Sequence, residues 1–512
     1  MVKTLRLILG DQLNHSHSWF KEKNNNVTYI LMEVMQEQDY VKHHIQKIVG
    51  FFLAMRQFAR ELKDEGHQVI YYYLDTKENQ QNFNDNLNWL IDKLGIEKFE
   101  YQLPDEYRLD QQFKAYTKSI KIASEAFDTE HFYTNRDEVQ NLFKGKKQYL
   151  METFYRYMRK KHHVLVDDTL NPIGEKWNFD EENRKKYDGK TPLKNPLTFK
   201  RDATEVIKMI EKMEVPHFGN IKTKEFPYPI CREDALELIE YFCENLLPAF
   251  GKYEDAMLKE HTTLFHSSLS FALNLKMISP QEVIQQVITS WEINKNTISL
   301  SQVEGFVRQV IGWREYMRGM YWAHMPEFAA LNWLNQQNDL PSWFWDGKVK
   351  MNCLKHCINN SLDHAYTHHI QRLMVIGNFT LLAGCHPDEV DKWYLGVYAD
   401  AAEWVQITNT RGMSQFADGG LIGSKPYVAS ANYINKMSNY CTGCHYDKDK
   451  RHGNKACPLN SLYWNFYLQH QEKFEKNPRI GMMYRLIEKM GADEIDKIQH
   501  QAKIYLSEIN SI

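Results

Sequence analysis

The chain has 512 residues, of which 43% are hydrophobic and 25% charged, and its formal net charge is −3. This length is too great for one hydrophobic core and predicts two or three domains. The lack of any apolar run of 18 residues excludes a membrane-spanning helix, and the near-neutral charge excludes general polyanion binding. Nucleic-acid binding would therefore need a local basic patch.

The first residues predict a buried strand and not a secretion signal. The apolar run at residues 5–9 is interrupted by Arg6 and ends without a small-residue cleavage site. We therefore expect a protein of the cytoplasm. In that compartment the eight cysteines should be reduced thiols or metal ligands, not disulfides.

Residues 1–130 predict an α/β domain with a parallel sheet. Four short apolar runs have the character of buried strands, namely residues 5–9, 27–32, 69–74 and 98–103. A helical period at residues 39–65 separates the second run from the third, and such alternation is typical of parallel sheets. Ligands of these sheets bind at the carboxyl ends of the strands, which directs attention to residues 10–12 and 33–37.

Residues 131–235 interrupt this alternation and predict an interdomain linker that runs over the surface. Prolines recur along the segment, as is typical of irregular connections. Basic side chains also gather there, among them Lys160, Lys161, Arg184 and Lys185. Such clusters are commonly solvated faces, and contact with nucleic-acid phosphates is the alternative.

Residues 236–512 predict an all-α domain. No strand pattern is persuasive in this part of the chain. Helical periodicity is clear in four segments, residues 235–243, 303–321, 364–382 and 482–490.

Three cysteines lie close together near the C-terminus. Cys441 and Cys444 form a Cys-x2-Cys pair, and Cys457 follows with a proline directly after it. A lone third cysteine before proline is similar to the end of a ferredoxin motif. The fourth ligand must come from far upstream, where Cys353 and Cys357 are both candidates. We interpret the set as a [4Fe–4S] site.

Two other interpretations of these cysteines remain open. Zinc shares the Cys-x2-Cys spacing, and His445 and His452 could complete its ligands. Alternatively, the cysteines are unrelated buried thiols.

A segment rich in histidine precedes the cysteines. It contains His364, His368, His369 and Arg372. On one continuous helix His364 and His368 would lie a turn apart and could bind a metal, but the glutamate of a zinc-protease motif is missing. Histidine titrates near neutrality, so the segment could donate a proton to a substrate. Buried core histidines are the alternative.

These segments together resemble the photolyase–cryptochrome superfamily. Arg308-Gln-x-x-Gly-Trp-Arg-Glu315 is similar to its flavin-domain signature, and His368-His369-x-x-Arg372 resembles a pentad of animal (6-4) photolyases. The four cysteines, Gly10-Asp-Gln-Leu13 and Lys176-Trp-Asn-Phe-Asp180 resemble the iron–sulfur bacterial branch. The resemblance extends over the whole chain.

This resemblance implies a monomeric lyase that repairs (6-4) pyrimidine–pyrimidone photoproducts in UV-damaged DNA. Repair would use an electron from light-excited reduced FAD, held in the helical domain of the photolyase fold. Arg372 would pair with Asp400 beside the flavin. The other implied FAD contacts are Tyr253, Ser267, Ser268, Ser270, Arg308 and Asn409.

The resemblance also implies roles at the lesion and at the cluster. His369 would donate the proton. Leu373 stands where animal enzymes have a second active-site histidine, so His369 would act with His368 or with a substitute elsewhere in the chain. Cys353 would be the fourth cluster ligand in preference to Cys357.

An antenna and an electron path are implied as well. A 6,7-dimethyl-8-ribityllumazine chromophore would bind near Asp11, Gln12 and Glu37, in agreement with the site expected at the strand ends. Trp345, Trp393 and Tyr394 resemble the path that reduces the flavin. For each of these aromatic residues a purely structural place in the core is the alternative.

Two other functions compete with repair. A cryptochrome-like blue-light photoreceptor would share the fold and cofactors but leave the lesion unchanged. A flavin-free iron–sulfur DNA-binding module would lack the absorption bands of flavin.

Overall fold

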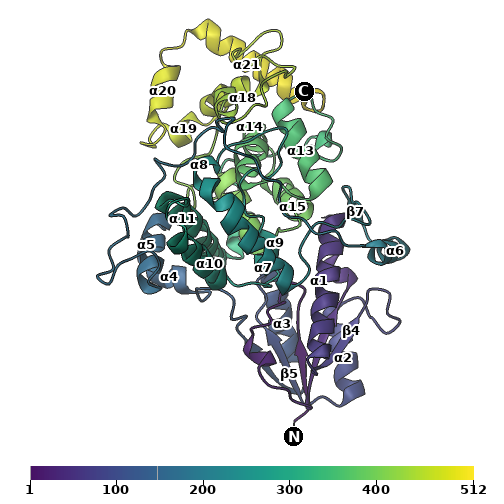
Figure 1. Ribbon diagram of the computed structural model, residues 1–512. Helices are drawn as coiled ribbons and strands as arrows, with labels where there is room; N and C mark the ends of the chain where they lie inside the picture. Colours follow the sequence, from purple (N-terminus) through teal and green to yellow (C-terminus); the bar gives the residue numbers. More distant parts are fainter. Residues whose placement is uncertain (1, 147) are drawn as a thin grey trace.

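A parallel sheet forms one end of the molecule and helices form the remainder (Figure 1). The computed structural model describes residues 2–146 and 148–512. The sheet has the strand order β4-β2-β1-β5-β6. Its strands are β1 (Thr4–Leu7), β2 (Val27–Met32), β4 (Gln68–Tyr72), β5 (Lys98–Gln102) and β6 (Ala123–Phe127).

The central strand β1 marks the point where the chain changes direction across the sheet. β2 lies on one side of β1 and β5 on the other, and both pair with it in parallel. Leu5 and Leu7 are fully buried, because helices cover the sheet. In open parallel sheets such a switch point opens a crevice at the carboxyl ends of the strands. The residues after β1, including Asp11, lie there.

Helix α1 (Ile45–Asp64) runs from the sheet into the helical part of the molecule (Figure 1). Its buried side chains, such as Ile48, Phe52, Met55 and Phe58, follow a helical period. Helices α2 (Phe83–Leu94) and α3 (Tyr107–Ser119) complete the α/β part.

The segment expected to be a linker contains helices and buried residues. Its helices are α4 (Glu138–Leu142), α5 (Met151–Lys161) and α6 (Thr204–Lys212). Phe154 and Tyr155 are fully buried, so α5 is part of the core and does not merely lie on the surface. The two-residue strands β3 (His43–His44) and β7 (His217–Phe218) pair and attach the segment to α1.

Beyond β7 the described residues form helices and no further named strand, which confirms the all-α expectation. None of the helices in the described ranges is both long and apolar enough to cross a lipid bilayer. The helices are α7 (Arg232–Tyr241), α8 (Phe250–Tyr253), α9 (Ser270–Asn274), α10 (Pro280–Ile293), α11 (Leu300–Val307), α12 (Glu315–His324), α13 (Asn352–His364), α14 (Asn378–Leu382), α15 (Pro387–Val397), α16 (Glu403–Ile407), α17 (Ala431–Met437), α18 (Pro458–Gln469), α19 (Gln471–Phe474), α20 (Gly481–Ile487) and α21 (Ala492–Ser507).

Four π-helical segments interrupt this part of the described chain, and the first is η3 (Phe242–Leu246). The other three are η5 (Arg308–Arg314), η8 (Gln371–Gly377) and η9 (Thr408–Ser414). π-Helical turns are rare and are frequent at functional sites. Each of the three carries one residue predicted to contact FAD, namely Arg308, Arg372 and Asn409.

The prediction of one helix over residues 364–382 is wrong. Helix α13 ends at His364, and Ala365 takes a left-handed conformation with φ of 49°. The small side chain of alanine tolerates this conformation better than a bulky one would. His364 and His368 therefore lie on opposite sides of a break and do not form a metal-binding pair on one helix.

Candidate functional site

Arg372 and Asp400 form the ion pair that the sequence suggested. Arg372 Nη2 lies 3.0 and 3.1 Å from the two carboxylate oxygens of Asp400. Ser270 Oγ donates to the same carboxylate at 2.6 Å, and Arg372 Nε donates to the Thr367 carbonyl at 2.7 Å. Burial lowers the pKa of Arg372, but Asp400, Tyr398 and Tyr366 together outweigh burial and raise the pKa overall. The hydrogen bonds fix the geometry of the pair.

His369 begins the helix after the break. Its side chain is exposed on one side. Protein atoms crowd its other sides, and this desolvation, with the charges of Arg372 and Arg184, lowers its pKa to about 4. Near neutral pH its imidazole is therefore uncharged, with one nitrogen that donates and one that accepts.

A second imidazole, that of His266, stacks on His368. The ring centroids are 4.4 Å apart and the planes differ by 13°. Burial lowers the pKa of His266 to about 4 and that of His368 well below its usual value. Among the described residues, neither nitrogen of His368 nor Nε2 of His266 has a hydrogen-bond partner. Buried nitrogens are rarely left unpaired, so these atoms suit a bound polar ligand.

Sequence reasoning missed His266. The signal was present, because His266 directly precedes Ser267 in a segment already assigned to the flavin. Ser268, the next residue, has a φ of 57° and hydrogen-bonds the side chain of Tyr366. This turn holds the serines and His266 in one loop, and Ser267 Oγ lies 3.5 Å from the amide of Leu269.

Tyr253, Arg308 and Asn409 all use their polar groups within the protein. Tyr253 Oη lies 2.9 Å from Thr191 Oγ1 in the linker. Asn409 Nδ2 donates to a carbonyl one turn earlier in its own helix, at 2.7 Å. Arg308 is held by two carboxylates, those of Glu304 and Asp180, each at 2.8 Å. Arg308 thereby ties the linker motif to the helical part.

Two of the three predicted electron-path residues are packed together. Trp393 and Tyr394 are buried in α15 with ring centroids 5.4 Å apart. Trp345 is 45% exposed and contacts neither ring among the recorded aromatic pairs of the described chain. Its chain neighbour Phe344 links the two places, because the Phe344 ring lies 4.9 Å from that of Trp393.

Tyr398 extends this aromatic cluster to the ion pair and was not predicted. Its ring lies 5.6 Å from Tyr394 and 6.0 Å from Trp393. The guanidinium of Arg372 lies 3.7 Å from the Tyr398 ring centroid. Its position four residues after Tyr394 was the available sequence signal.

All four predicted cysteine ligands line one small cavity. These are Cys353, Cys441, Cys444 and Cys457. Apolar residues such as Met351, Ile434 and Leu459 form much of the remaining wall. Cys357 does not line it; its Sγ lies 3.9 Å from the Tyr440 hydroxyl.

The spacing of the thiols fits a cluster better than a single zinc ion. Zn–S bonds of about 2.3 Å place four tetrahedral sulfurs less than about 4 Å apart. Within the described chain, the one set of three candidate ligand atoms that lie within 4.8 Å of one another is Glu61, Cys231 and Glu233. No three of the four thiol sulfurs therefore lie as close together as tetrahedral zinc ligands do, which favours the larger cluster.

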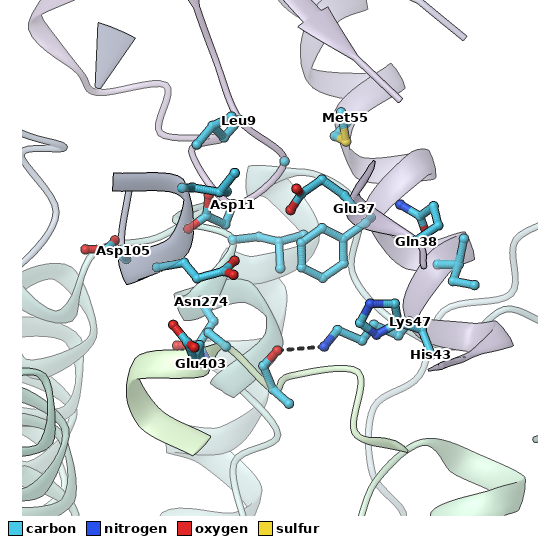
Figure 2. A pocket seen from close by; sticks show the side chains of 18 of the residues that line it. Leu9, Asp11, Glu37, Gln38, His43, Lys47, Met55, Asp105, Asn274 and Glu403 are labelled. Atoms are coloured by element: carbon cyan, nitrogen blue, oxygen red, sulfur yellow. Dashed lines mark hydrogen bonds between the residues drawn. The ribbon is translucent and has the colours of Figure 1, made fainter. Parts of the chain in front are cut away.

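A larger cavity, of about 130 Å³, opens at the carboxyl ends of the strands. A single buried water needs only about 10–15 Å³. Figure 2 shows Asp11 and Glu37 on the sheet side of this cavity and Glu403 and Asn274 on the helical side. The site expected at the strand ends is thus a cavity closed by the second half of the chain.

Carboxyl groups with raised pKa values surround this cavity. Burial and the nearby charge of Glu106 raise the pKa of Glu37 to about 8, against the opposing effect of Arg108. Burial raises the pKa of Glu106 to about 7 and also raises those of Glu403 and Asp11. Near neutral pH several of these groups can therefore donate as well as accept hydrogen bonds. Sequence reasoning missed Glu106 and Glu403.

Gln12 supports this cavity from behind and is not part of its wall. Gln12 is fully buried. Its Oε1 accepts from the Leu9 amide at 3.0 Å, and its Nε2 donates to the Gln102 carbonyl at 3.2 Å. These bonds fix the turn that presents Asp11.

The four basic residues predicted to contact DNA differ in their exposure and in their ion pairs. Lys160 and Lys185 are exposed. Lys161 is paired with a glutamate of α4. Arg184 lies 3.0 Å from Glu254 and is close enough to His369 to lower its pKa.

Comparison with known proteins places these features in context. A family model described as deoxyribodipyrimidine photo-lyase-related protein matches residues 6–226. The chain is 40% identical over 510 residues to a (6-4) photolyase of Agrobacterium fabrum, and the match covers 99% of both chains. An uncharacterized mimivirus protein, R855, is 36% identical over 107 residues, which is 21% of this chain and 80% of that protein.

Two solved structures have a similar fold. A bacterial class III photolyase from Agrobacterium tumefaciens superposes with a TM-score of 0.54 at 14% identity, covering 85% of this chain and 86% of that one. A Synechocystis cryptochrome gives a TM-score of 0.51 at 10% identity, covering 81% and 83%. These likenesses confirm the expected fold class.

Proposed function

The chain belongs to the (6-4) photolyase family, and on this premise we propose that it repairs (6-4) photoproducts in DNA with light. One observation carries the proposal beyond family membership. His369, an accessible imidazole that can take up and pass on a proton, lies beside the Arg372–Asp400 pair expected at the flavin. Proton donation and cofactor binding would thus occur at one place.

The residues around this pair fit FAD. Unpartnered buried atoms, at His266, His368 and Thr263, lie in or beside the loops predicted to hold it. Arg372 and Asp400 together offer a donor and an acceptor to the edge of a flavin ring. When bound, FAD would supply the light-excited electron donor, and the protein would orient it and exclude water.

His369 would hold the proton that the lesion receives. The imidazolium is the form that can transfer a proton and leave a neutral ring, and the negative charge of bound DNA phosphates would raise the pKa of His369 toward that form. A flipped lesion reaches such a pocket at reduced cost, because damaged bases are already poorly stacked. The charge of Arg184 nearby would attract the flanking phosphates.

His266 would provide the second imidazole that Leu373 cannot. It stacks on His368, the chain neighbour of His369, and His369 is among the groups that lower its pKa. The second imidazole would therefore come from the serine loop and not from the next turn of the same helix.

We further propose a [4Fe–4S] cluster in the cysteine cavity and a lumazine antenna in the larger cavity. The thiol spacing supports the cluster, with ligands Cys353, Cys441, Cys444 and Cys457. The position at the strand ends and the hydrogen-bonding carboxyl groups, with Glu37 and Asp11 among them, support the antenna. A cytoplasmic location and a monomeric state stay predictions.

The repair assay tests this function. Purified protein with bound flavin would be incubated with DNA that carries a single (6-4) lesion, in blue light and in darkness. We expect intact pyrimidines to appear only in the light. Unchanged lesion in both samples would favour the photoreceptor, and a protein without flavin absorption would favour the DNA-binding module.

A further inference from the structure

Tyr440 connects the cysteine cavity to the histidine segment. Its ring lines the cavity beside Cys441. Its hydroxyl accepts a hydrogen bond from Gln371 Nε2 at 2.9 Å, and Gln371 Oε1 accepts one from the backbone N–H of His368 at 3.1 Å. Tyr440 and Gln371 are both fully buried. Two hydrogen bonds thus separate the cavity wall from the backbone next to His369.

The hydrogen bond that Gln371 accepts from His368 caps the start of the helix that carries His369. The first backbone N–H groups of a helix have no partner within it. His368 precedes the first helical residue, and Gln371 lies three positions later, where a glutamine side chain can reach back to the capping residue. Ala365 ends the previous helix just upstream, so this bond helps to set where the new helix begins.

The His368 N–H fixes the orientation of the Gln371 amide, and the Tyr440 hydroxyl holds the other end of that amide in place. An amide side chain can rotate to exchange its oxygen and nitrogen, and only its neighbours decide between the two. The His368 N–H can only donate, so it pairs with Oε1, and Nε2 then donates to the Tyr440 oxygen. The Tyr440 hydroxyl also accepts a weak hydrogen bond from the thiol of Cys357, at 3.9 Å. Reversal would bring two donors together in a buried site, which is strongly disfavoured.

We infer that Tyr440 and Gln371 are positioning residues. Through them the cysteine loop (residues 440–457) holds the His368–His369 backbone in place for proton donation. This inference rests on the proposed function. It gives the cysteine loop a structural role at the repair site, and this role needs no electron transfer between the cysteine cavity and the flavin site.

Two substitutions test this hydrogen-bond chain in the flavin- and iron-loaded protein. Tyr440→Phe removes one oxygen, and Gln371→Met removes both bonds while keeping the side-chain length. We expect iron and flavin per chain to stay unchanged in both variants. One buried hydrogen bond contributes only modestly to the stability of the folded state, so exchange of the His368 amide hydrogen should accelerate roughly twofold to tenfold. Light-driven repair should fall by a similar factor.

Tyr505→Phe is the matched control. Tyr505 is also buried near the cysteines, but its hydroxyl donates to the Ala456 carbonyl at 2.6 Å and not to the histidine segment. Its loss should leave exchange at His368 and repair unchanged. If both quantities also stay at the wild-type level in Tyr440→Phe and Gln371→Met, the inference is wrong. A wild-type protein that repairs no lesion would instead overturn the proposed function, while hydrogen exchange would still decide the positioning role.

Discussion

Histidines with lowered pKa values dominate the chemistry of this molecule at the scale of single residues. Desolvation and nearby charged groups lower the pKa values of the buried His368, the half-buried His266 and the accessible His369. None of these three would carry a charge near neutral pH in the protein alone. The positive charge at the site then comes from Arg372 and Arg184, which cannot give up a proton. His369 therefore needs the higher pKa that bound DNA phosphates would give it in order to donate a proton.

His44 provides a stability test at this scale. It caps α1 by accepting from the Gln46 amide and lies 2.8 Å from the Leu362 carbonyl. Burial lowers its pKa to about 4, below the usual 6.5, so its stabilisation is present above about pH 6.5 and is lost as pH falls toward 4. This loss amounts to about 3 kcal/mol.

We therefore predict that His44→Asn flattens the acid limb of the stability curve. Urea unfolding would be measured at about pH 7 and about pH 4.5 for the wild type, for this variant and for the exposed control His500→Asn. The variant should lose less stability between the two pH values than the other two proteins. Parallel losses in all three would contradict the role of His44.

His266 provides a functional test. His266→Phe keeps an aromatic ring against His368 but removes both ring nitrogens. We predict that flavin stays bound while repair falls about tenfold or more and its pH profile changes, since general acid–base groups contribute at least this much. Leu373→Ile is the control, because it changes the position vacated by the second histidine without changing its chemistry. Full repair by His266→Phe would exclude the second-imidazole proposal.

At the scale of secondary-structure elements, the site depends on helices that break. The prediction from sequence succeeded for strands β1, β2, β4 and β5, whose apolar runs are buried or, in β4, mostly half-buried. It missed β6, whose residues are mostly exposed and lack an apolar pattern. It also missed the break at Ala365, because alanine is a strong helix former and no glycine or proline marks the end. The orientation of His369 depends on that break.

The exposed basic residue Lys185, in the linker, predicts where DNA binds. Lys185 is exposed, whereas Arg184 beside it is already paired with Glu254. Lys185→Glu should weaken binding of lesion DNA and reduce its salt dependence, because fewer counterions are released. Binding isotherms at several salt concentrations would measure this. Lys77→Glu, the same change in an exposed loop of the α/β part, should have no such effect; equal losses in both would point to another surface.

The cysteine loop gives a second prediction for an element. Cys457→Ala should remove iron, because three thiolates hold a cluster poorly, and should destabilise α18, which begins at Pro458. Iron per chain and the far-ultraviolet circular dichroism of the purified protein would measure both. Cys357→Ala is the matched control, since Cys357 does not line the cavity, and it should keep its iron. Iron retained in the Cys457 variant would contradict the ligand assignment.

At the scale of the whole molecule, the two halves of the chain close a cavity that neither forms alone. Asp11 and Glu37 were predicted from the strand ends, but Glu106 and Glu403 were not. Nearly 300 residues separate these two glutamates, and no local pattern indicates that they meet. The cysteine set and the Arg372–Asp400 pair were easier to predict, because a known family carries them in the same order.

Filling the cavity should remove the antenna chromophore and leave the flavin bound, which would show that the two occupy different sites. Ile48 lines its wall and is 3% exposed. Ile48→Trp should exclude a lumazine, at an overpacking cost of about 1–3 kcal/mol, yet leave FAD bound and active under light that flavin absorbs. Acid-released chromophores would be separated and identified, with Ile48→Val as the control. Lumazine retained by the tryptophan variant would show that the antenna binds elsewhere.

The most direct test of the central claim compares wild type with His369→Gln on DNA that carries one (6-4) lesion. Both proteins should contain the same amount of flavin, because His369 lies beside the flavin site and is not expected to hold it. We predict that blue light restores the pyrimidines with the wild type and that the variant, without its proton donor, leaves the lesion intact. Equal repair by both proteins, or none by the wild type, would contradict the account.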